Sequence, residues 1–174
     1  MKSKLSLFLF TVMVISSVAC SKSSNNSTPQ DSNPNVTING SATDLTGYSG
    51  AMYLGSANLD SIVILNTGST DSSLIKGINR IPPVQTTPNF LQIYLTSRSS
   101  ISTATYSIGG NNVVNMIVVC QINGQRYGAA TQGTVTIDTL SFSRVSGTYN
   151  ATVVNGSTFV STNISGKFGA NILP

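Results

Sequence analysis

The sequence contains no histidine and no tryptophan, and because all five of its acidic side chains are aspartates, it contains no glutamate either. Histidine is the commonest general acid–base residue, and it takes part in most catalytic triads and catalytic zinc sites. Its absence excludes those sites. Without tryptophan, the chain also lacks the largest aromatic platform on which a sugar ring can stack. These absences favour a protein that is not an enzyme.

The few carboxylates do not form a recognisable catalytic or metal-binding motif. They are Asp31, Asp44, Asp60, Asp71 and Asp138. A glycoside hydrolase needs two carboxylates on either side of the scissile bond, and nothing in the spacing pairs these five. Residues 31–33 resemble a fragment of a calcium loop, but the following glycine and the distal glutamate are missing. We therefore expect no catalytic residues, no metal and no cofactor.

Positive charge is sparse, and part of it lies at the extreme N-terminus. The formal net charge is +4, and it falls to +2 if Lys2 and Lys4 are removed with a leader. The remaining cations occur singly along the chain: Lys22, Lys76, Arg80, Arg98, Arg126, Arg144 and Lys167. A nucleic-acid-binding surface needs clustered lysine and arginine to follow the phosphate backbone. The sequence therefore predicts no nucleic-acid partner.

The first 19 residues have the three parts of a secretory signal peptide. Lys2 and Lys4 provide a positive start, residues 5–18 form an apolar run, and small residues follow. The apolar run is shorter than the roughly 20 residues that span a bilayer. We therefore expect residues 1–19 to be an export signal that is removed, and we expect no other part of the chain to be embedded in the membrane.

The signal ends at Cys20, in the sequence Ser17-Val18-Ala19-Cys20. This motif resembles the bacterial lipobox, in which the cysteine is lipidated and becomes the new N-terminus; Ser17 stands where that motif usually has leucine. Ser17 and Ala19 also fit an ordinary signal-peptidase site, which would leave a mature protein without an anchor. The polar segment that follows favours lipidation, and the resemblance implies that Cys20 holds the protein on the membrane.

A polar segment separates the cysteine from the rest of the chain. Residues 21–35 are rich in serine, asparagine, threonine and proline and contain almost nothing apolar. Such a segment cannot bury enough surface to offset its ordering entropy, so it is predicted to be a flexible tether. The expected organisation is a signal peptide over residues 1–19, the lipidated cysteine and tether over 20–35, and one domain over 36–174.

The domain has the pattern of strands and turns, without a helical stretch. Valine, isoleucine, threonine and aromatic residues recur in short runs that are separated by glycine, asparagine, serine and proline. The predicted strands cover residues 36–38, 48–54, 61–65, 74–78, 90–96, 103–108, 113–122, 125–129, 133–139, 147–154, 157–163 and 167–172. About ten short strands indicate a sandwich or a barrel. We favour an all-β, antiparallel two-sheet β-sandwich, with the proline-rich residues 80–89 crossing between sheets.

Local signals add detail to this fold. Asn39-Gly40, Asn123-Gly124 and Asn155-Gly156 are predicted turns, and the last two should close tight hairpins. Residues 113–122 are continuously apolar, which predicts a central strand that is buried on both faces. Cys120 lies in this strand and is expected to act as a small buried hydrophobic residue. With Cys20 lipidated, Cys120 has no disulfide partner.

The C-terminal half contains several short strand motifs of similar composition. Residues 105–108 read Thr-Tyr-Ser-Ile, 133–137 read Gly-Thr-Val-Thr-Ile, 147–151 read Gly-Thr-Tyr-Asn-Ala, and 162–168 read Thr-Asn-Ile-Ser-Gly-Lys-Phe. Over about residues 60–172 the chain resembles a family of lipid-anchored domains of unknown function from Gram-negative cell envelopes. The resemblance implies a β-sandwich held on the outer membrane, and it brings no catalytic residues. Tyr106, Tyr149 and Phe168 are expected to pack in the core or at its rim.

Three functional hypotheses follow. The first is an outer-membrane lipoprotein whose domain is a non-catalytic accessory or interaction module, with its partner, its ligand site and the side of the membrane left open. The second is a surface glycan-binding module, for which the candidate stacking residues are Tyr48, Tyr53, Tyr94 and Tyr127. The third is a hydrolase with a pair of aspartates, which requires two carboxylates in one cleft. The expected partners are the membrane, through Cys20, and an envelope protein or glycan.

Overall fold

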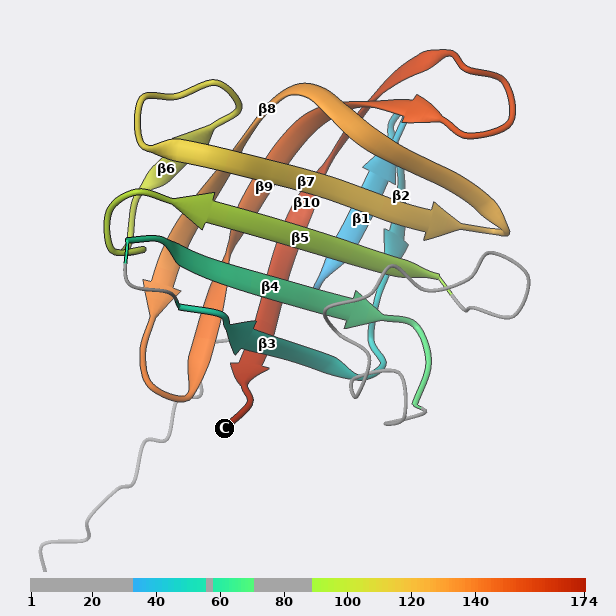
Figure 1. The fold of residues 1–174 in the computed structure, drawn as a ribbon. Coiled ribbons are helices and arrows are strands. Elements are labelled where there is room, and N and C mark those ends of the chain that lie inside the picture. Colours follow the sequence, from blue (N-terminus) through green and yellow to red (C-terminus); the bar gives the residue numbers. More distant parts are fainter. Residues whose placement is uncertain (1–32, 56–57, 71–88) are drawn as a thin grey trace, which may run out of the picture. The chain divides into compact units, whose positions relative to one another are not determined.

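The computed structural model describes residues 33–55, 58–70 and 89–174, and all regular structure in these residues is β-strand (Figure 1). There are ten strands: β1 (Asn35–Ile38), β2 (Ser41–Asp44), β3 (Ser49–Tyr53), β4 (Asp60–Thr67), β5 (Phe90–Ser97), β6 (Thr105–Ser107), β7 (Val113–Ile122), β8 (Gln125–Leu140), β9 (Arg144–Asn155) and β10 (Ser161–Ile172). The all-β prediction is confirmed. The described residues include no helix that is long and apolar enough to cross a membrane.

Several predictions fall on residues that lie outside the described ones. These are the signal peptide over 1–19, Cys20 with most of the tether, the strand over 74–78 and the proline-rich crossing over 80–88.

All ten strands belong to one continuous sheet, and the pairings of seven of them close into a ring. The order β3-β4-β5-β7-β8-β9-β10 is antiparallel throughout, and β10 returns to β3 through a short parallel pairing at Asn171↔Gly50 and Ile172↔Ala51. In Figure 1, β3, β4, β5 and β7 cross in front of β8, β9 and β10. The predicted division into two separate sheets is not confirmed, because these two layers are joined at both sides.

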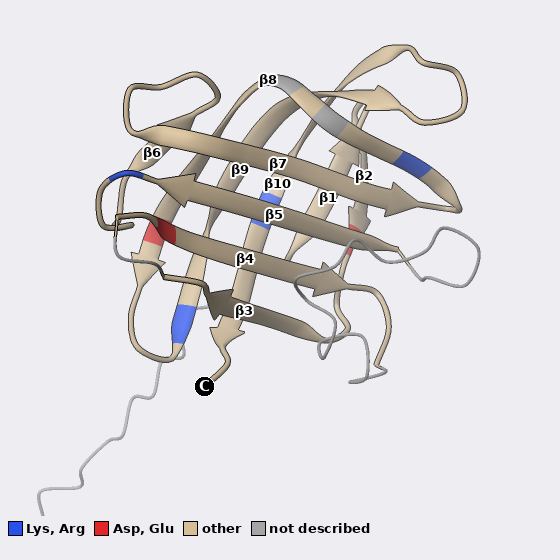
Figure 2. Cartoon of the chain, viewed as in Figure 1, with Lys and Arg blue, Asp and Glu red and all other residues tan. Residues whose placement is uncertain are grey.

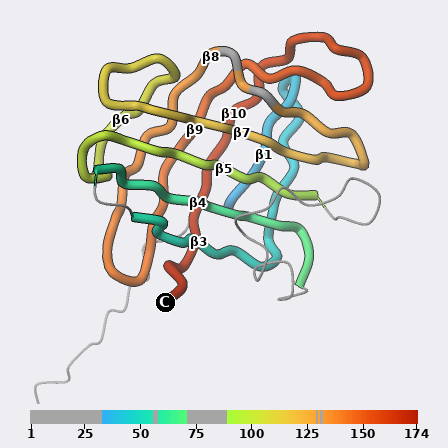
Figure 3. Tube along the Cα trace, viewed as in Figure 1, coloured from blue at the N-terminus to red at the C-terminus, as the bar shows by residue number. Residues whose placement is uncertain are grey.

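The front and back layers are joined by β8. Its first residues pair with β7, from Ile122↔Gln125 to Cys120↔Tyr127, and its later residues pair with β9. The pairing with β9 shifts register between Gly128 and Gln132, and such a bulge bends a strand and increases its twist. Figure 3 shows how β8 passes along the top of the view from one layer to the other. The sequence predicted two strands, over 125–129 and 133–139, where the structure has one bent strand.

The predicted turns have two different outcomes. Asn39 and Gly40 have φ angles of 49° and 83°, and Asn123 and Gly124 have φ angles of 51° and 77°. Both turns are therefore confirmed, and the second has the two positive φ angles that a type I′ hairpin turn requires. The β9–β10 hairpin also forms, but the prediction that Asn155-Gly156 is its tight turn is wrong.

Asn155 cannot be a turn residue because it is used as a strand residue. It pairs with Tyr127 of β8, and its own N–H donates to the Val160 carbonyl at 2.9 Å. Its side-chain Oδ1 accepts the N–H groups of Ser157 and Thr158, both at 2.9 Å, which is the asparagine-capped form of a longer loop. The loop over 156–160 therefore replaces the two-residue turn, and Phe159 has a φ of 57° within it.

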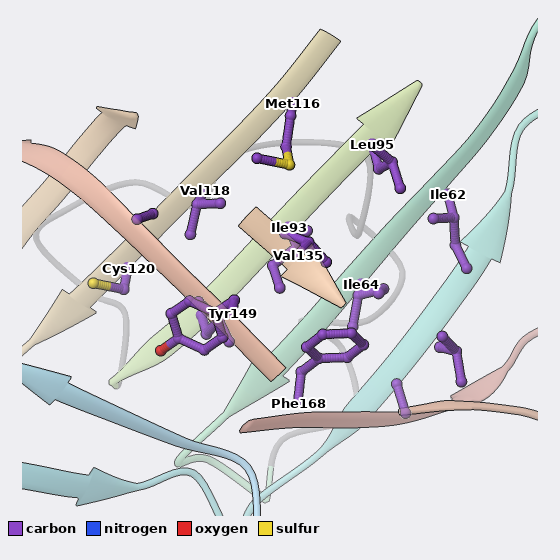
Figure 4. Packing of buried hydrophobic residues seen from close by; sticks show 14 of the residues in the cluster. Ile62, Ile64, Ile93, Leu95, Met116, Val118, Cys120, Val135, Tyr149 and Phe168 are labelled. Atoms are coloured by element: carbon purple, nitrogen blue, oxygen red, sulfur yellow. The ribbon is translucent and has the colours of Figure 1, made fainter. Parts of the chain in front are cut away.

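The main hydrophobic core lies between the two layers. Ile62, Ile64, Ile93 and Leu95 of the front layer face Val135, Tyr149 and Phe168 of the back layer (Figure 4). Phe168 is fully buried and pairs across the strands with Gly147, where an added Cβ would overlap the Thr136 carbonyl oxygen. The expectation that Tyr106, Tyr149 and Phe168 are core residues is confirmed, since all three are buried.

Strand β7 has the predicted bounds, but only its second half is buried on both faces. Val118, Val119 and Cys120 are buried, whereas Val114 and Asn115 are exposed. The reason is that β8 pairs with β7 only at Cys120–Ile122 before it bends into the back layer. The first half of β7 therefore has a paired strand, β5, on one side only.

The strand predicted over residues 90–96 is confirmed as β5, and its side chains alternate between two apolar clusters. Leu91, Ile93 and Leu95 belong to the main core, whereas Phe90 belongs to a second apolar cluster with Val63. Adjacent strand residues point to opposite faces, so this second cluster lies on the outer face of the front layer.

Candidate binding groove

The described aspartates lie on strands that are not paired with one another. Cys20, Asp31 and Asp71 lie outside the described residues. Asp44, Asp60 and Asp138 belong to β2, β4 and β8, and no two of these strands are neighbours in the sheet (Figure 2). Within the described part of the chain, no group of three histidine, cysteine, aspartate or glutamate side chains could hold a metal ion.

Cys120 is a buried, free thiol, as predicted. It lies in the main core, fully removed from solvent. Burial raises the pKa of the Cys120 thiol from 9.0 to about 12. Since the thiolate is the nucleophile, a thiol that stays protonated is a poor candidate for a reactive site.

The four tyrosines proposed as a stacking platform do not act together. Tyr48 and Tyr53 are exposed, but they flank opposite ends of β3 and line different hollows. Tyr94 packs against the second apolar cluster, and Tyr127 packs against the main core. Of the four, only Tyr53 lines a groove with apolar walls.

That groove, here called the Tyr53 groove, has a volume of about 530 Å³. Its lining residues come from the ends of four strands and from two connections: Tyr53, Asp60, Ile101, Leu140, Ser141, Phe142 and Ile172. Most of these side chains are apolar, and the polar ones are few. Small-molecule sites have this composition and lie in the same range of volume.

The β8–β9 turn forms one wall of the groove and is held by its own hydrogen bonds. Ser141 N–H donates to the Arg144 carbonyl at 2.9 Å, and Arg144 N–H donates back to Ser141 Oγ at 3.1 Å. Ile172 N–H of β10 donates to the Ser143 carbonyl at 2.9 Å, which ties the turn to the neighbouring strand. Between these fixed residues, the Phe142 side chain is fully exposed, at 105% of its reference area.

The other wall combines a carboxylate with a phenol. Asp60 Oδ2 accepts the N–H of Ile101 at 3.0 Å, which holds the β5–β6 connection over the groove. Burial raises the pKa of Tyr53, and the nearby Asp60 and Tyr106 raise it further. Tyr53 therefore remains a neutral phenol at physiological pH and offers both a hydrogen-bond donor and an acceptor.

The groove has the chemistry of a binding site. It has one carboxylate, one neutral phenol, one serine hydroxyl and apolar side chains. General acid–base catalysis at a carboxylate pair would need a second acid, and Asp60 is the one acidic residue among those that line the groove. A ligand with an apolar face and hydroxyl or amine donors fits these groups.

Most of these residues were not predicted from the sequence. Tyr53 and Asp60 were candidate site residues, whereas Leu140, Phe142 and Ile172 were not. One signal was available: Phe142 stands between two serines, in a position that the sheet pattern assigns to a turn. An apolar aromatic residue at the tip of a turn is exposed at a cost in solvation, and such a residue is a candidate for binding.

A second hollow, of about 510 Å³, lies on the other side of Arg144. It is lined by Tyr48 and Arg144 together with Asn33 and Pro34, where the described chain begins.

No protein-family model matches this chain, and no match was found among curated proteins or among solved structures.

Proposed function

We propose that this protein is a lipid-anchored cell-envelope protein whose β-domain is a non-catalytic binding module. The anchor part of the proposal is supported by the apolar leader, by Cys20 at its end and by the polar segment that follows. The proposed anchor is a multiply acylated Cys20, because a single acyl chain gives only marginal membrane binding.

The observation that carries the binding part is the Tyr53 groove. Its lining includes the aromatic side chains of Tyr53 and Phe142, and its carboxylate Asp60 is oriented by the Ile101 amide. Because Asp60 is already held by a backbone hydrogen bond, it loses little freedom when a partner binds.

A glycan is the second candidate for the partner of the groove. Tyr53 and Phe142 line the same cavity as Asp60 and Ser141, so a sugar ring placed against the aromatic residues would have a carboxylate and a hydroxyl within the same groove. This version of the glycan hypothesis rests on one tyrosine and one phenylalanine, not on the four tyrosines.

Photo-crosslinking in intact cells tests the binding module. A benzophenone amino acid at position 142 should give an adduct that disappears when Tyr53 is replaced by alanine. The same amino acid at position 159 is the matched control, because Phe159 is also an exposed phenylalanine (80%) in a loop, at the other end of β9. Equal adducts at both positions, or no adduct at position 142, would contradict a binding role for the groove.

A further inference from the structure

Exposed apolar side chains gather along one edge of the domain. Seven large hydrophobic side chains are exposed among the described residues, and four of them, Tyr48, Tyr53, Leu54 and Phe142, flank β3 or lie in the β8–β9 turn. In Figure 1, β3 and this turn lie at the lower edge of the domain, together with the end of β10. We call these four residues the aromatic rim.

The chain enters the domain at the same edge. Asn33 and Pro34 line the second hollow together with Tyr48 and Arg144. Arg144 is hydrogen-bonded into the turn that carries Phe142, through Ser141. The entry point of the chain is therefore bordered by Tyr48 on one side and by the Phe142 turn on the other.

We propose that the aromatic rim is a membrane-contact surface, which rests on the bilayer that holds Cys20. This inference rests on the proposed lipid anchor. It identifies the bilayer as the partner that contacts the edge of the domain containing the Tyr53 groove. Twelve residues lie between Cys20 and Asn33. A tether of this length that is flexible, as the sequence predicts, has an end-to-end distance of about 20 Å, so it would keep the edge at which it enters close to the bilayer at a high effective concentration.

The residues of the rim suit the membrane interface. Tyrosine is enriched at the level of the lipid headgroups because its ring is apolar and its hydroxyl is polar. Phe142 and Leu54 provide apolar surface without a hydroxyl.

The opposite end of the domain provides an internal comparison. Phe159 and Val160 are exposed in the β9–β10 loop, at 80% and 60%. This loop is fixed by hydrogen bonds from Phe159 N–H to the Asn155 carbonyl and from Gln125 Nε2 to Ser157 Oγ. β9 contains 12 residues and is roughly 36 Å long, and the two exposed phenylalanines lie beyond its opposite ends. If the rim rests on the bilayer, Phe159 points away from it.

The absence of tryptophan makes a direct test possible, because a single introduced tryptophan is the only one in the chain. Phe142→Trp and Phe159→Trp are made in the full-length chain, which is purified from the membrane fraction. Each protein is reconstituted into vesicles of phosphatidylcholine and phosphatidylethanolamine. The tryptophan at position 142 should shift its emission to the blue, and its quenching by iodide should fall several-fold. The tryptophan at position 159 should remain fully quenchable.

The outcomes separate this inference from the proposed function. A protein that does not float with the vesicles refutes the lipid anchor, and the inference falls with it. A protein that floats while position 142 keeps the emission of a solvated tryptophan refutes the inference alone. The inference is also refuted if both positions shift equally, if a soluble glycan shifts position 142 while vesicles do not, or if the shift requires raised protein concentration, as contact with a second copy would.

Discussion

Replacement of Phe168 by alanine is expected to lower the free energy of unfolding by about 3–5 kcal/mol. Phe168 is fully buried in β10 and packs between the two layers, where its ring lies over Gly147 of the paired strand β9. Backbone surrounds this position closely, because even a Cβ on Gly147 would overlap the Thr136 carbonyl. The two layers cannot collapse to fill the space left by the ring, so the cost should be near the upper end of the range.

Urea denaturation of the wild type and the variant measures this effect, as a lower midpoint with an unchanged slope. Phe142→Ala is the matched control, because it removes the same side chain from a fully exposed position. It should change the stability by less than about 0.5 kcal/mol. A cost for Phe168→Ala that is no larger than that of Phe142→Ala would mean that the core between the layers is not packed as described.

The domain should lose stability steeply above pH 9. Burial raises the pKa of Cys120 to about 12. Burial is also the largest cause that raises the pKa of Tyr149, and the charge of Cys120 is the second cause. The Tyr149 hydroxyl donates to the Asn35 carbonyl at 3.0 Å. Both folded pKa values lie above the unfolded ones of 9.0 and 10.0. The stabilisation is therefore fully present below pH 9, and it is lost as the unfolded chain releases protons that the folded chain retains.

Each of the two groups should reduce the free energy of unfolding by about 1.4 kcal/mol per pH unit within its window. For Cys120 this window runs from about pH 9 to about pH 12, and for Tyr149 it begins near pH 10. Urea midpoints measured between pH 8 and pH 11 test the slope. Tyr149→Phe should flatten the dependence above pH 10, and Cys120→Ala should flatten it from pH 9, whatever their stability at pH 8. If both variants keep the slope of the wild type, these groups are not buried as protonated acids.

The positions of most strands could be predicted from the sequence because the signals are local. Apolar and polar residues alternate in 90–96 and 133–139, which separates an inward from an outward face, and the structure buries Val135 and Ile137. The bounds of β7 and the Asn123-Gly124 turn that follows it were predicted without error. Each of these features depends on a few adjacent residues, so the physical cause lies within the segment.

The closure of the sheet could not be predicted in the same way. It depends on the bend in β8 and on two residue pairs between β10 and β3, which are more than 100 residues apart in the chain. Nothing in the sequence around Gly50 or around Asn171 indicates that these two segments pair. The failure at Asn155 also arises outside the local segment, because its pairing with Tyr127, 28 residues earlier in β8, overrides the turn preference of Asn-Gly.

The Tyr53 groove escaped prediction for a related reason. Its residues come from positions 53 to 172, and only the fold brings Tyr53, Phe142 and Ile172 to one edge. The types of residue that line it are common in strands, so composition did not distinguish them from the core. The proposed anchor at Cys20 is the opposite case, since its evidence is a contiguous motif in the sequence.

Lipidation of Cys20 underlies the proposed function, and the mass of the mature N-terminus is a direct test of it. Trypsin cleaves after Lys22, so the first peptide of a processed chain consists of residues 20–22. We expect the membrane fraction to yield this peptide with acyl groups on Cys20, and we expect Cys20→Ala to abolish both the peptide and the membrane association. A peptide that begins at Cys20 with a free amine and an unmodified thiol would refute the lipidation of Cys20.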